Sequence, residues 1–355
     1  MADHGEKQNS TYDVIVIGAG PAGAEASLAA AGRGARTLCL TISLDTAGFP
    51  PANPILADGF DDPRHTLLAE IESLGGTLPL LLKAEGVSGG AGDGVLLADR
   101  RRLGLSYKQA LETGDNLEFR QALVTSIRPQ GDGWSVATAL AEEFHCRSIV
   151  LAAGTFCEGK VSAGGAIRPG GRLGEIAAAA LPRSLRGLGL EMTRVDAATS
   201  PRLPAALSVS VPGSNSARFP ADGIQLHEVY GHGLEITGPA ASQLSQLRSR
   251  LRRNDAWISR PSFSVSHLCL AAGQVDHDLR SAAYGGLFAA GRFAGGCNYV
   301  EAAALGIVAG ANAAATAAPA GKSLISCPKI VSILCSRVAT RRQRPVTIRI
   351  EGEGC

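Results

Sequence analysis

The sequence is poor in aromatic and charged residues. Phe, Trp and Tyr make up 5% of its 355 residues, and Asp, Glu, Lys and Arg make up 19%. The formal net charge is only +2, which argues against a protein that coats nucleic acid over its whole surface. Because 45% of the residues are apolar, general disorder is excluded, and the length allows two domains with a large core.

Patterns typical of metal sites, leaders and membrane spans are also missing. The 8 cysteines form no CxxC pair, and His227 and His232 lack the HExxH spacing of a zinc site. The N-terminal MADHGEKQNS is polar, unlike a signal peptide. The run 302–320 is mostly alanine, which gives too little transfer energy for a membrane span. We therefore expect no metal, no membrane, a buried helix over 302–320 and a reduced, cytoplasmic protein.

Glycine, in contrast, is abundant, with 44 residues that follow no G-X-Y period, so collagen is excluded. Part of this excess falls in a predicted βαβ unit, with a strand over 12–17, a helix over 24–31 and a strand over 37–41. Between the first strand and the helix lies Gly18-Ala-Gly20-Pro-Ala-Gly23, a GxGxxG motif in its usual context.

This motif predicts a dinucleotide cofactor. The first glycine allows a tight turn, the second lets a pyrophosphate touch the backbone, and the third lets the helix pack on the strand. The N–H groups at the start of the helix would bind the phosphates. The alternative interpretation is a purely structural glycine turn. The expected cofactor contacts here are Gly18, Gly20, Pro21, Ala22 and Gly23.

The end of the second strand bears on which dinucleotide binds. An NAD site usually has an acidic residue there, which holds the ribose. This strand ends in Thr41, and Asp45 a few residues later is the candidate substitute. The lack of an acidic residue at the end of this strand favours a flavin site, which would include Thr41 and Asp45.

Two later segments favour FAD more firmly. Residues 149–155 and 286–292 each resemble a strand that ends in a glycine turn at a flavin, and the helix that follows 298 resembles one that directs its N-terminus at the isoalloxazine. A positive helix end there would stabilise the anion of a reduced flavin. Each segment on its own is equally typical of an ordinary strand, turn and helix that bind no cofactor. The further expected contacts are Leu123, Ala153, Gly154, Thr155, Gly291, Arg292, Glu301 and Ala302.

With these motifs, the chain resembles the glucose-inhibited division protein A family (GidA, also called MnmG) from Tyr12 to about Ala314. The early block contains Leu44-Asp45-Thr46 and Gly48, a middle block begins with GGRLG at 170–174, and the closing block starts with GLFAAGRFAGGCNYVEAAA. The family's flavoproteins help to install the carboxymethylaminomethyl group on the wobble uridine of certain tRNAs. The resemblance implies FAD as cofactor, NAD(P)H as a candidate electron donor, and tRNA and a second copy of the chain as candidate partners.

Several residues depart from the family pattern. Ala52 stands where the family has a cysteine before Asn-Pro, and no Cys-Pro run occurs between Ser208 and Phe219. Arg292 replaces a glutamine, and Ala178 replaces a serine. The long helical C-terminal region, associated with tRNA and partner binding, is missing. A thiolate nucleophile needs a thiol, which alanine cannot provide. The residues expected to bind the cofactor therefore match the family better than those expected to carry out the reaction, and short GidA-related proteins are the closer match.

The expected fold is α/β, with a Rossmann-like FAD-binding domain of the glutathione-reductase type and an inserted smaller α+β domain. A single strand is expected over 117–127. The basic tail is expected to be a poorly ordered extension, with an arm for nucleic acid as the alternative. The expected divisions are a first FAD-binding part over 11–160, the inserted domain over 161–284, the returning FAD-binding part over 285–320 and the tail over 321–355.

No residue is identified as catalytic. Cys157 and Cys297 lie beside glycine turns and are weak candidates for redox or nucleophilic thiols, although small-residue packing is the preferred interpretation. Arg292 is a candidate cation beside a reduced flavin or an acidic substrate, with a surface ion pair as the alternative. Candidate phosphate or RNA contacts are Arg168, Arg172 and Arg202.

Three functions agree with this sequence. The first is an FAD-dependent oxidoreductase of the wobble-uridine type, which the missing cysteines and C-terminal region weaken. The second is a stand-alone FAD oxidoreductase that acts on a small substrate. The third is a flavin-binding module without turnover. The glycine motif favours all three equally.

Overall fold

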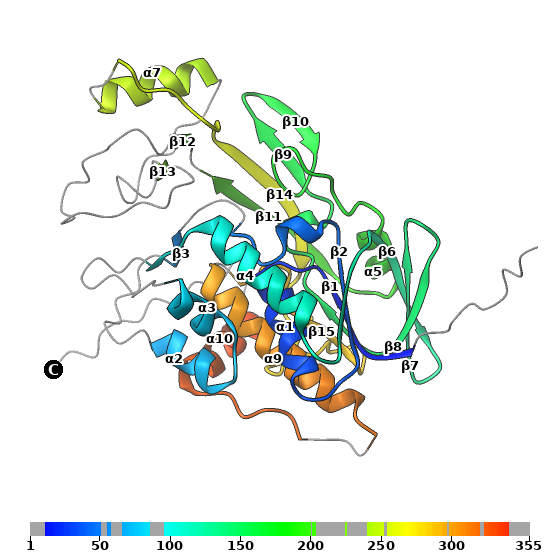
Figure 1. Ribbon diagram of the computed structural model, residues 1–355. Coiled ribbons are helices and arrows are strands. Elements are labelled where there is room, and N and C mark those ends of the chain that lie inside the picture. The colour runs from blue at the N-terminus through cyan, green and yellow to red at the C-terminus, as the bar shows by residue number, and fades with distance from the viewer. Residues whose placement is uncertain are drawn as a thin grey trace, which may run out of the picture.

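The computed structural model describes residues 11–50, 55–57, 66–85, 96–199, 201–203, 224–225, 240–251, 254–296, 298–319 and 323–340. Two main sheets organise this part of the chain, one of seven strands and one of four. Figure 1 shows the smaller sheet above the larger one, with the helices α1 and α9 packed beside the larger sheet.

The larger sheet runs in the order β5-β2-β1-β8-β7-β6, and β15 pairs with the end of β8. Strands β5, β2, β1, β8 and β15 are parallel neighbours, whereas β6 and β7 form an antiparallel hairpin that joins β8. The central strands are almost wholly buried, which agrees with their apolar, β-branched sequences. The bounds are β1 Thr11–Ile17, β2 Thr37–Thr41, β5 Leu117–Gln121, β6 Val124–Gln130, β7 Gly133–Thr138, β8 Glu143–Leu151 and β15 Leu287–Ala289.

Two helices made mostly of small residues, α1 and α9, pack against each other beside this sheet. A Cβ atom added at Gly306 would lie 2.2 Å from the Ala22 carbonyl oxygen, and one added at Gly310 would lie 2.1 Å from that of Ala26. By length and composition α9 could cross a membrane, but 94% of its most apolar stretch is buried inside the protein, as predicted for a core helix. The bounds are α1 Pro21–Ala31 and α9 Tyr299–Ala317.

Further helices pack around this pair. The longer ones are α2 Thr66–Ser73, α3 Leu78–Ala84, α4 Arg100–Thr113 and α10 Lys329–Thr340. Short helical turns are η1 Leu44–Thr46, η2 Gly154–Phe156 and α8 Gly291–Ala294, and two short strands are β3 Ile55–Ala57 and β4 Leu96–Leu97. Helix α4 begins at Arg100 because the Asp99 side chain accepts hydrogen bonds from the N–H groups of Arg101 and Arg102.

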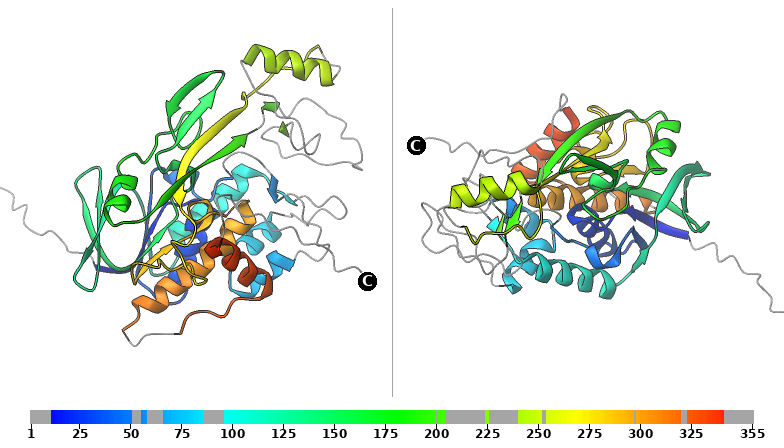
Figure 2. Two further views of the ribbon diagram at one scale, coloured as in Figure 1. Left: turned by 180° about the vertical axis from the view of Figure 1, so that it is seen from behind. Right: turned by 90° about the horizontal axis from the view of Figure 1, so that it is seen from above.

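The smaller sheet is antiparallel and has the order β10-β9-β14-β11. Figure 2, from behind and from above, shows helix α7 at the outer end of this sheet. The combination of antiparallel strands and a few helices agrees with the inserted α+β domain that the sequence predicted. The bounds are β9 Lys160–Ala163, β10 Ala166–Pro169, α5 Leu181–Gly187, β11 Met192–Thr199, β12 Arg202–Leu203, β13 Ile224–Gln225, α7 Ala240–Leu251 and β14 Phe263–Leu270.

Part of the expected basic tail is a packed helix. The Glu70 carboxylate accepts hydrogen bonds from the backbone N–H groups of Ile330 (3.0 Å) and Val331 (2.8 Å), which satisfies the start of α10. The helix buries Val331, Leu334, Cys335 and Val338 against the core. A poorly ordered extension is therefore wrong for 329–340, and 341–355 lie outside the described residues.

The single strand predicted over 117–127 is also wrong. β5 lies parallel to β2, whereas β6 pairs antiparallel with β7, so the chain turns at Ala122 and Leu123 to change partners. The hairpin turn predicted at 131–133 is confirmed, because β6 ends at Gln130 and β7 begins at Gly133.

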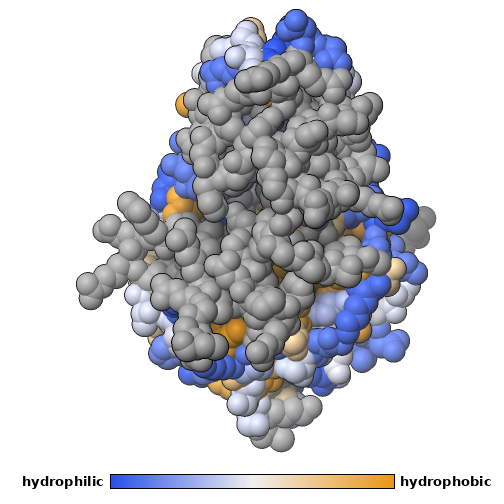
Figure 3. Space-filling view, turned by 90° about the vertical axis from the view of Figure 1, so that its left-hand side faces the viewer, coloured by the Kyte–Doolittle hydropathy of each residue, from blue (hydrophilic) through white to orange (hydrophobic). Residues whose placement is uncertain are grey.

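Large apolar side chains on the surface are scattered. On the face in Figure 3 the coloured surface is mostly hydrophilic, with small separate apolar patches. The described large apolar residues that are exposed are Leu80, Leu105, Leu140, Ile167, Leu173, Ile176, Trp257 and Ile333.

Candidate cofactor site

The predicted cofactor segments meet at one edge of the larger sheet. The Ala152 N–H, just after β8, donates to the Ile17 carbonyl at the end of β1 (2.9 Å). The Ala290 N–H, just after β15, donates to the Leu151 carbonyl (3.0 Å). Because the carboxyl ends of parallel strands lie at a common edge, where α/β proteins bind ligands, segments far apart in sequence are brought together.

The glycine turn between β1 and α1 is fixed at two of its glycines and open at the third. Gly18 has φ +103°, and a Cβ there would lie 2.5 Å from the Ala152 carbonyl oxygen. A Cβ at Gly23 would lie 1.6 Å from the Gly18 carbonyl oxygen, so only glycine allows this packing. A Cβ at Gly20 would meet nothing within 4 Å. The turn therefore fits a pyrophosphate that approaches the backbone at Gly20.

The first turn of α1 supports the same interpretation. The helix has no side-chain cap and no acidic residue in its first turn. Its earliest N–H groups lack partners within the helix, and the helix dipole is positive at this end. Pro21 at the first helical position loses nothing, since its missing N–H would have no helical partner.

The predicted cofactor segment over 286–292 packs against the start of α1, beside the glycine turn, through α8. Gly291 has φ +63°, and a Cβ there would lie 2.6 Å from Ala22 Cβ and 3.5 Å from Ala302 Cβ. Glu301 and Asn298 form a capping box, in which the Asn298 Oδ1 accepts from the Glu301 N–H (2.8 Å) and Glu301 Oε2 accepts from the Asn298 N–H (3.2 Å). Glu301 therefore shapes the start of α9.

The residues predicted at the ribose end have other partners. The Thr41 hydroxyl donates to the Ser43 carbonyl (3.3 Å). Asp45, on η1, forms an ion pair with Lys108 Nζ (2.8 Å), and its side chain is 87% exposed. Leu123 lies half-buried in the connection after β5. Thr41 is the last residue of β2, and Asp45 and Leu123 follow the ends of the neighbouring parallel strands β2 and β5. Their contact with a ribose or adenine remains a prediction.

The segment after β8 leads from the edge of the larger sheet to the smaller sheet. Gly154 has φ +55°, and a Cβ there would meet nothing within 4 Å. The Thr155 hydroxyl donates to the Gly171 carbonyl (2.7 Å), which anchors η2 to the loop after β10. Ala153 precedes η2 as its N-terminal cap residue.

The structure does not assemble the catalytic candidates Cys157, Cys297 and Arg292 into a reactive cluster in the described part of the chain. Cys157 is fully buried, and burial raises the pKa of its thiol to about 12, which opposes a thiolate role at neutral pH. Cys297 lies outside the described residues. Arg292 is half-buried on α8. Burial lowers the pKa of His267 on β14, and the charge of Arg292 acts in the same direction. No cluster of three or more His, Cys, Asp or Glu in the described part of the chain could hold a metal ion.

The sequence did not reveal a group of arginines and phenylalanines beside this edge. The guanidinium carbons of Arg100 and Arg172 lie 4.8 and 5.6 Å from the centre of the Phe49 ring. Arg172 also lies 5.7 Å from the Phe156 ring and forms an ion pair with Glu175 (3.1 Å). These cation–π contacts join the loop after η1, helix α4 and the loop after β10. Since they link distant segments, sequence spacing could not show them.

A buried acid on α1, Glu25, was also missed. Its carboxylate accepts hydrogen bonds from the N–H groups of Thr77 (2.9 Å) and Leu78 (2.6 Å) and from the Tyr107 hydroxyl (2.7 Å). Glu25 thereby caps α3, which has no side-chain cap of its own. The Tyr299 hydroxyl donates to the Gly48 carbonyl nearby, so this polar group ties α9 to the loop after η1.

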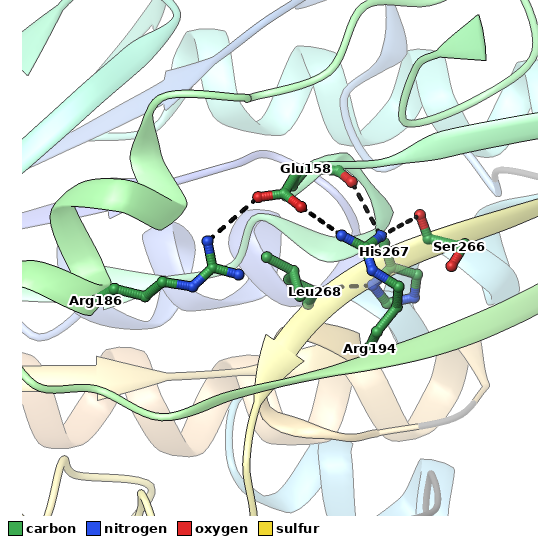
Figure 4. A network of polar contacts seen from close by, with 6 residues as sticks. All are labelled: Glu158, Arg186, Arg194, Ser266, His267 and Leu268. Carbon is green, nitrogen blue, oxygen red and sulfur yellow. Dashed lines mark hydrogen bonds and ion pairs between the residues drawn. The ribbon is translucent and has the colours of Figure 1, made fainter.

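Glu158, just after η2, lies between Arg186 and Arg194, as Figure 4 shows. Its carboxylate forms ion pairs with Arg186 of α5 (3.4 Å) and with Arg194 of β11. Arg194 also donates to the Glu158 carbonyl (3.3 Å) and the Ser266 carbonyl (3.2 Å). Glu158 has φ +47°, a left-handed conformation uncommon for glutamate, which these contacts hold in place.

Comparison with known proteins identifies the family. A family model described as glucose inhibited division protein A matches residues 13–211 and 214–320. The chain belongs to this family. Membership confirms the predicted resemblance and the Rossmann-like FAD-binding fold.

Two individual relatives share less than 30% sequence identity with this chain. The tRNA uridine 5-carboxymethylaminomethyl modification enzyme MnmG of Heliobacterium modesticaldum is 29% identical over 388 residues, which cover 85% of this chain and 60% of that protein. The enzyme of the same name from Synechocystis is 28% identical over 435 residues, which cover 96% of this chain and 68% of that protein. The chain thus spans about 60% of the length of several curated relatives it matches.

Solved structures show the same fold. Aquifex aeolicus GidA superimposes with a TM-score of 0.80 at 25% identity, covering 95% of this chain and 69% of that one. The GidA-related protein from Thermus thermophilus gives a TM-score of 0.53 at 19% identity, covering 85% of this chain and 97% of that one. The shorter GidA-related protein is thus matched over more of its length, and the longer GidA superimposes more closely.

Proposed function

We propose that this GidA-family protein binds FAD and is an FAD-dependent oxidoreductase of the tRNA wobble-uridine type. The observation that best supports it is the open position at Gly20, in a turn that Gly18 and Gly23 hold at the meeting edge of the parallel strands. When bound, FAD supplies the transfer of electrons. The chain's own residues supply the pyrophosphate turn, the anchored segment at Gly154 and the helix starts at α1 and α9.

The protein's residues favour an anionic reduced cofactor. Helix α9 starts beside the site, with its positive end held in place by the capping box of Asn298 and Glu301. Arg292 on α8 adds a fixed positive charge near the same edge. Fully buried apolar side chains at this edge, such as Phe288 and Phe293, would exclude water.

The proposal for tRNA rests on the family alone. The curated relatives are named as tRNA uridine modification enzymes. Alanine stands at 52 where the family has a cysteine, and residues 51–54 lie outside the described part of the chain. The stand-alone oxidoreductase is therefore the second candidate, favoured by the absence of a thiol at 52. A cytoplasmic location and NAD(P)H as the donor belong to the same proposal.

Two measurements on the FAD-loaded protein test this proposal. Under anaerobic conditions, NADH or NADPH should bleach the flavin absorbance, and failure of both nucleotides and of dithionite would indicate a non-catalytic module. Binding of tRNA is then measured over a salt series, because phosphate contacts weaken as salt rises. No binding at low salt would contradict the tRNA reaction and leave the small-substrate oxidoreductase.

A further inference from the structure

Two cysteines near the end of the described chain lie in contact with each other. The thiols of Cys327 and Cys335 form a hydrogen bond, and neither cysteine is part of a disulfide. Cys327 lies in the connection before α10, and Cys335 lies in the second turn of that helix. The two are too far apart in sequence for a CxxC motif. Neither is among the predicted cofactor contacts, so the pair is a separate feature of the molecule.

The fold places both thiol-bearing segments on helix α9. In the connection before α10, the Ile325 N–H donates to Asn312 Oδ1 of α9 (3.0 Å). Asn312 Nδ2 in turn donates to the Asp278 carbonyl oxygen (3.1 Å). Helix α10 packs on α9 and on α2, and Figure 1 shows it beside both. The contact between the two sulfurs is therefore fixed by the packing of both segments on a common helix.

The two thiols differ in their access to solvent. Cys327 is half-buried, whereas Cys335 is 1% exposed and lies in the hydrophobic core. A small oxidant in solution therefore reaches the sulfur of Cys327, and the core shields that of Cys335. An accessible thiol beside a second thiol is the arrangement of a redox pair, in which the first sulfur reacts and the second resolves the product.

The hydrogen bond also gives the two thiols different acidities. It lowers the pKa of Cys327 and raises the pKa of Cys335, so Cys335 is the donor and Cys327 is the acceptor. Burial and the negative charges of Asp278 and Glu70 act against the lower pKa of Cys327. The partner thiol thus favours a thiolate at Cys327, while Cys335 keeps its proton for a later step.

We propose that Cys327 and Cys335 form a redox site for hydroperoxides, in which Cys327 reacts with the oxidant and Cys335 closes a disulfide. In the first step the Cys327 thiolate attacks one oxygen of the peroxide. The O–O bond breaks, the sulfur becomes a sulfenic acid, and the other oxygen takes up a proton and leaves, as water when the oxidant is hydrogen peroxide.

The second step involves only the two cysteines. The sulfur of Cys335 attacks the sulfenic sulfur of Cys327, so the S–S bond forms as the S–O bond breaks. The hydroxyl group takes the proton of Cys335 and leaves as water. Over both steps the two thiols lose two electrons, which the peroxide gains. A thiol reductant returns the pair to its starting state, as is usual for redox-sensing disulfides inside cells.

A second pair of neighbouring thiols serves as an internal control. Burial, Glu158 and Cys269 together raise the pKa of Cys157 to about 12, so Cys269 lies close to it. These two cysteines are only 0% and 1% exposed. Because neither thiol is accessible, hydrogen peroxide should leave this pair reduced while the protein is folded.

Peptide mapping of the full-length protein tests the site. The folded protein is reduced, freed of reductant, treated with hydrogen peroxide and blocked with N-ethylmaleimide before digestion. Trypsin cuts after Lys329, between the two cysteines, so their disulfide joins the peptides 323–329 and 330–337 into one species. Cys335→Ser removes the resolving thiol, Cys327→Ser removes the reacting thiol, and Cys269→Ser is the matched control from the buried pair. Thermal unfolding verifies that each variant is folded.

The expected result separates a redox pair from two thiols that merely pack together. The linked peptides should form in the wild type and in Cys269→Ser, and dithiothreitol should separate them again. Cys335→Ser should accumulate a sulfenic acid at Cys327 that dimedone traps, and in Cys327→Ser oxidation of Cys335 should fall about tenfold or more.

Two outcomes would overturn the inference. One is peroxide-treated wild type without the linked peptides 323–329 and 330–337. The other is a disulfide between Cys157 and Cys269 that forms as fast as the linkage between Cys327 and Cys335. Neither measurement requires bound FAD, so failure of this site is distinguishable from failure of the proposed function.

Discussion

Gly306 of α9 lies against the backbone of Ala22 of α1, and a Cβ added at Gly306 would lie 2.2 Å from the Ala22 carbonyl oxygen. The contact joins the last cofactor segment to the first, because α1 begins at the glycine turn and α9 begins at the late turn. Close helix packing therefore fixes the spacing between the two helix starts that face the proposed flavin.

Gly306→Ala should destabilise the protein by about 3 kcal/mol, since the added methyl forces the two helices apart. It should also weaken FAD binding, because the glycine turn moves with α1. Chemical denaturation and FAD titration measure the two effects. Gly187→Ala is the control, since a Cβ at Gly187 meets nothing within 4 Å. Equal stability of the two variants would contradict the packing argument.

Gly20→Ala should affect the cofactor and spare the fold. Gly20 has φ −65°, which alanine adopts without strain, and a Cβ there meets no protein atom within 4 Å. The methyl would instead occupy the place of the pyrophosphate, so FAD affinity should fall about tenfold or more while thermal stability without FAD is unchanged. Gly285→Ala, also in open space but before β15, should leave affinity intact. Unchanged affinity in Gly20→Ala would exclude a pyrophosphate at this turn.

Glu25 should make stability depend on pH. Burial raises the pKa of Glu25 above its ordinary value of 4.5, despite the three hydrogen bonds it accepts. The Glu25 carboxyl thus stays protonated to higher pH in the folded protein than in the unfolded chain. The stability that this protonation contributes is fully present below pH 4.5 and is lost as pH rises through the raised pKa.

Glu25→Gln removes this titration and leaves buried donors imperfectly paired, at a cost of about 1–3 kcal/mol. The difference in unfolding free energy between wild type and variant should be largest near pH 4.5 and decrease at higher pH. Urea unfolding at several pH values measures it. A difference that is constant or grows with pH would show that the pKa of Glu25 is not raised.

The described cysteines should differ in reactivity. A hydrogen bond with Cys335 lowers the pKa of the half-buried Cys327, whereas burial raises the pKa of Cys157 to about 12. Iodoacetamide at pH 7.5 should therefore modify Cys327 well before Cys157 in the folded protein. Peptide mass spectrometry over time checks the order. Early modification of Cys157 would restore it as a candidate nucleophile.

The segments that the sequence predicted well are those whose partners are near in sequence. The βαβ unit around Gly18 and Gly23 follows from a buried apolar strand, a glycine motif and an alanine-rich helix. The late turn at Gly291 was found by the same local pattern. Their meeting at one edge follows from the parallel sheet, which the alternation of strands and helices already indicates.

What sequence reasoning missed depends on distant contacts. The split between β5 and β6 at Leu123 is set by their different partner strands. Helix α10 has apolar residues at helical spacing, such as Val331 and Leu334, yet its start is completed by Glu70 from another part of the chain. The contact of Cys327 with the thiol on α10 appears only once the connection before α10 is placed on α9.

The most direct test of the account is FAD uptake by the purified protein. The visible spectrum is recorded, the released cofactor is identified by mass, and FAD is titrated into cofactor-free protein. We predict a flavin spectrum, release of FAD, and a rise in thermal stability with FAD concentration, equal to about 2.7 kcal/mol at one hundred times the dissociation constant. A folded, colourless protein that takes up no FAD and gains no stability from it would contradict the central claim.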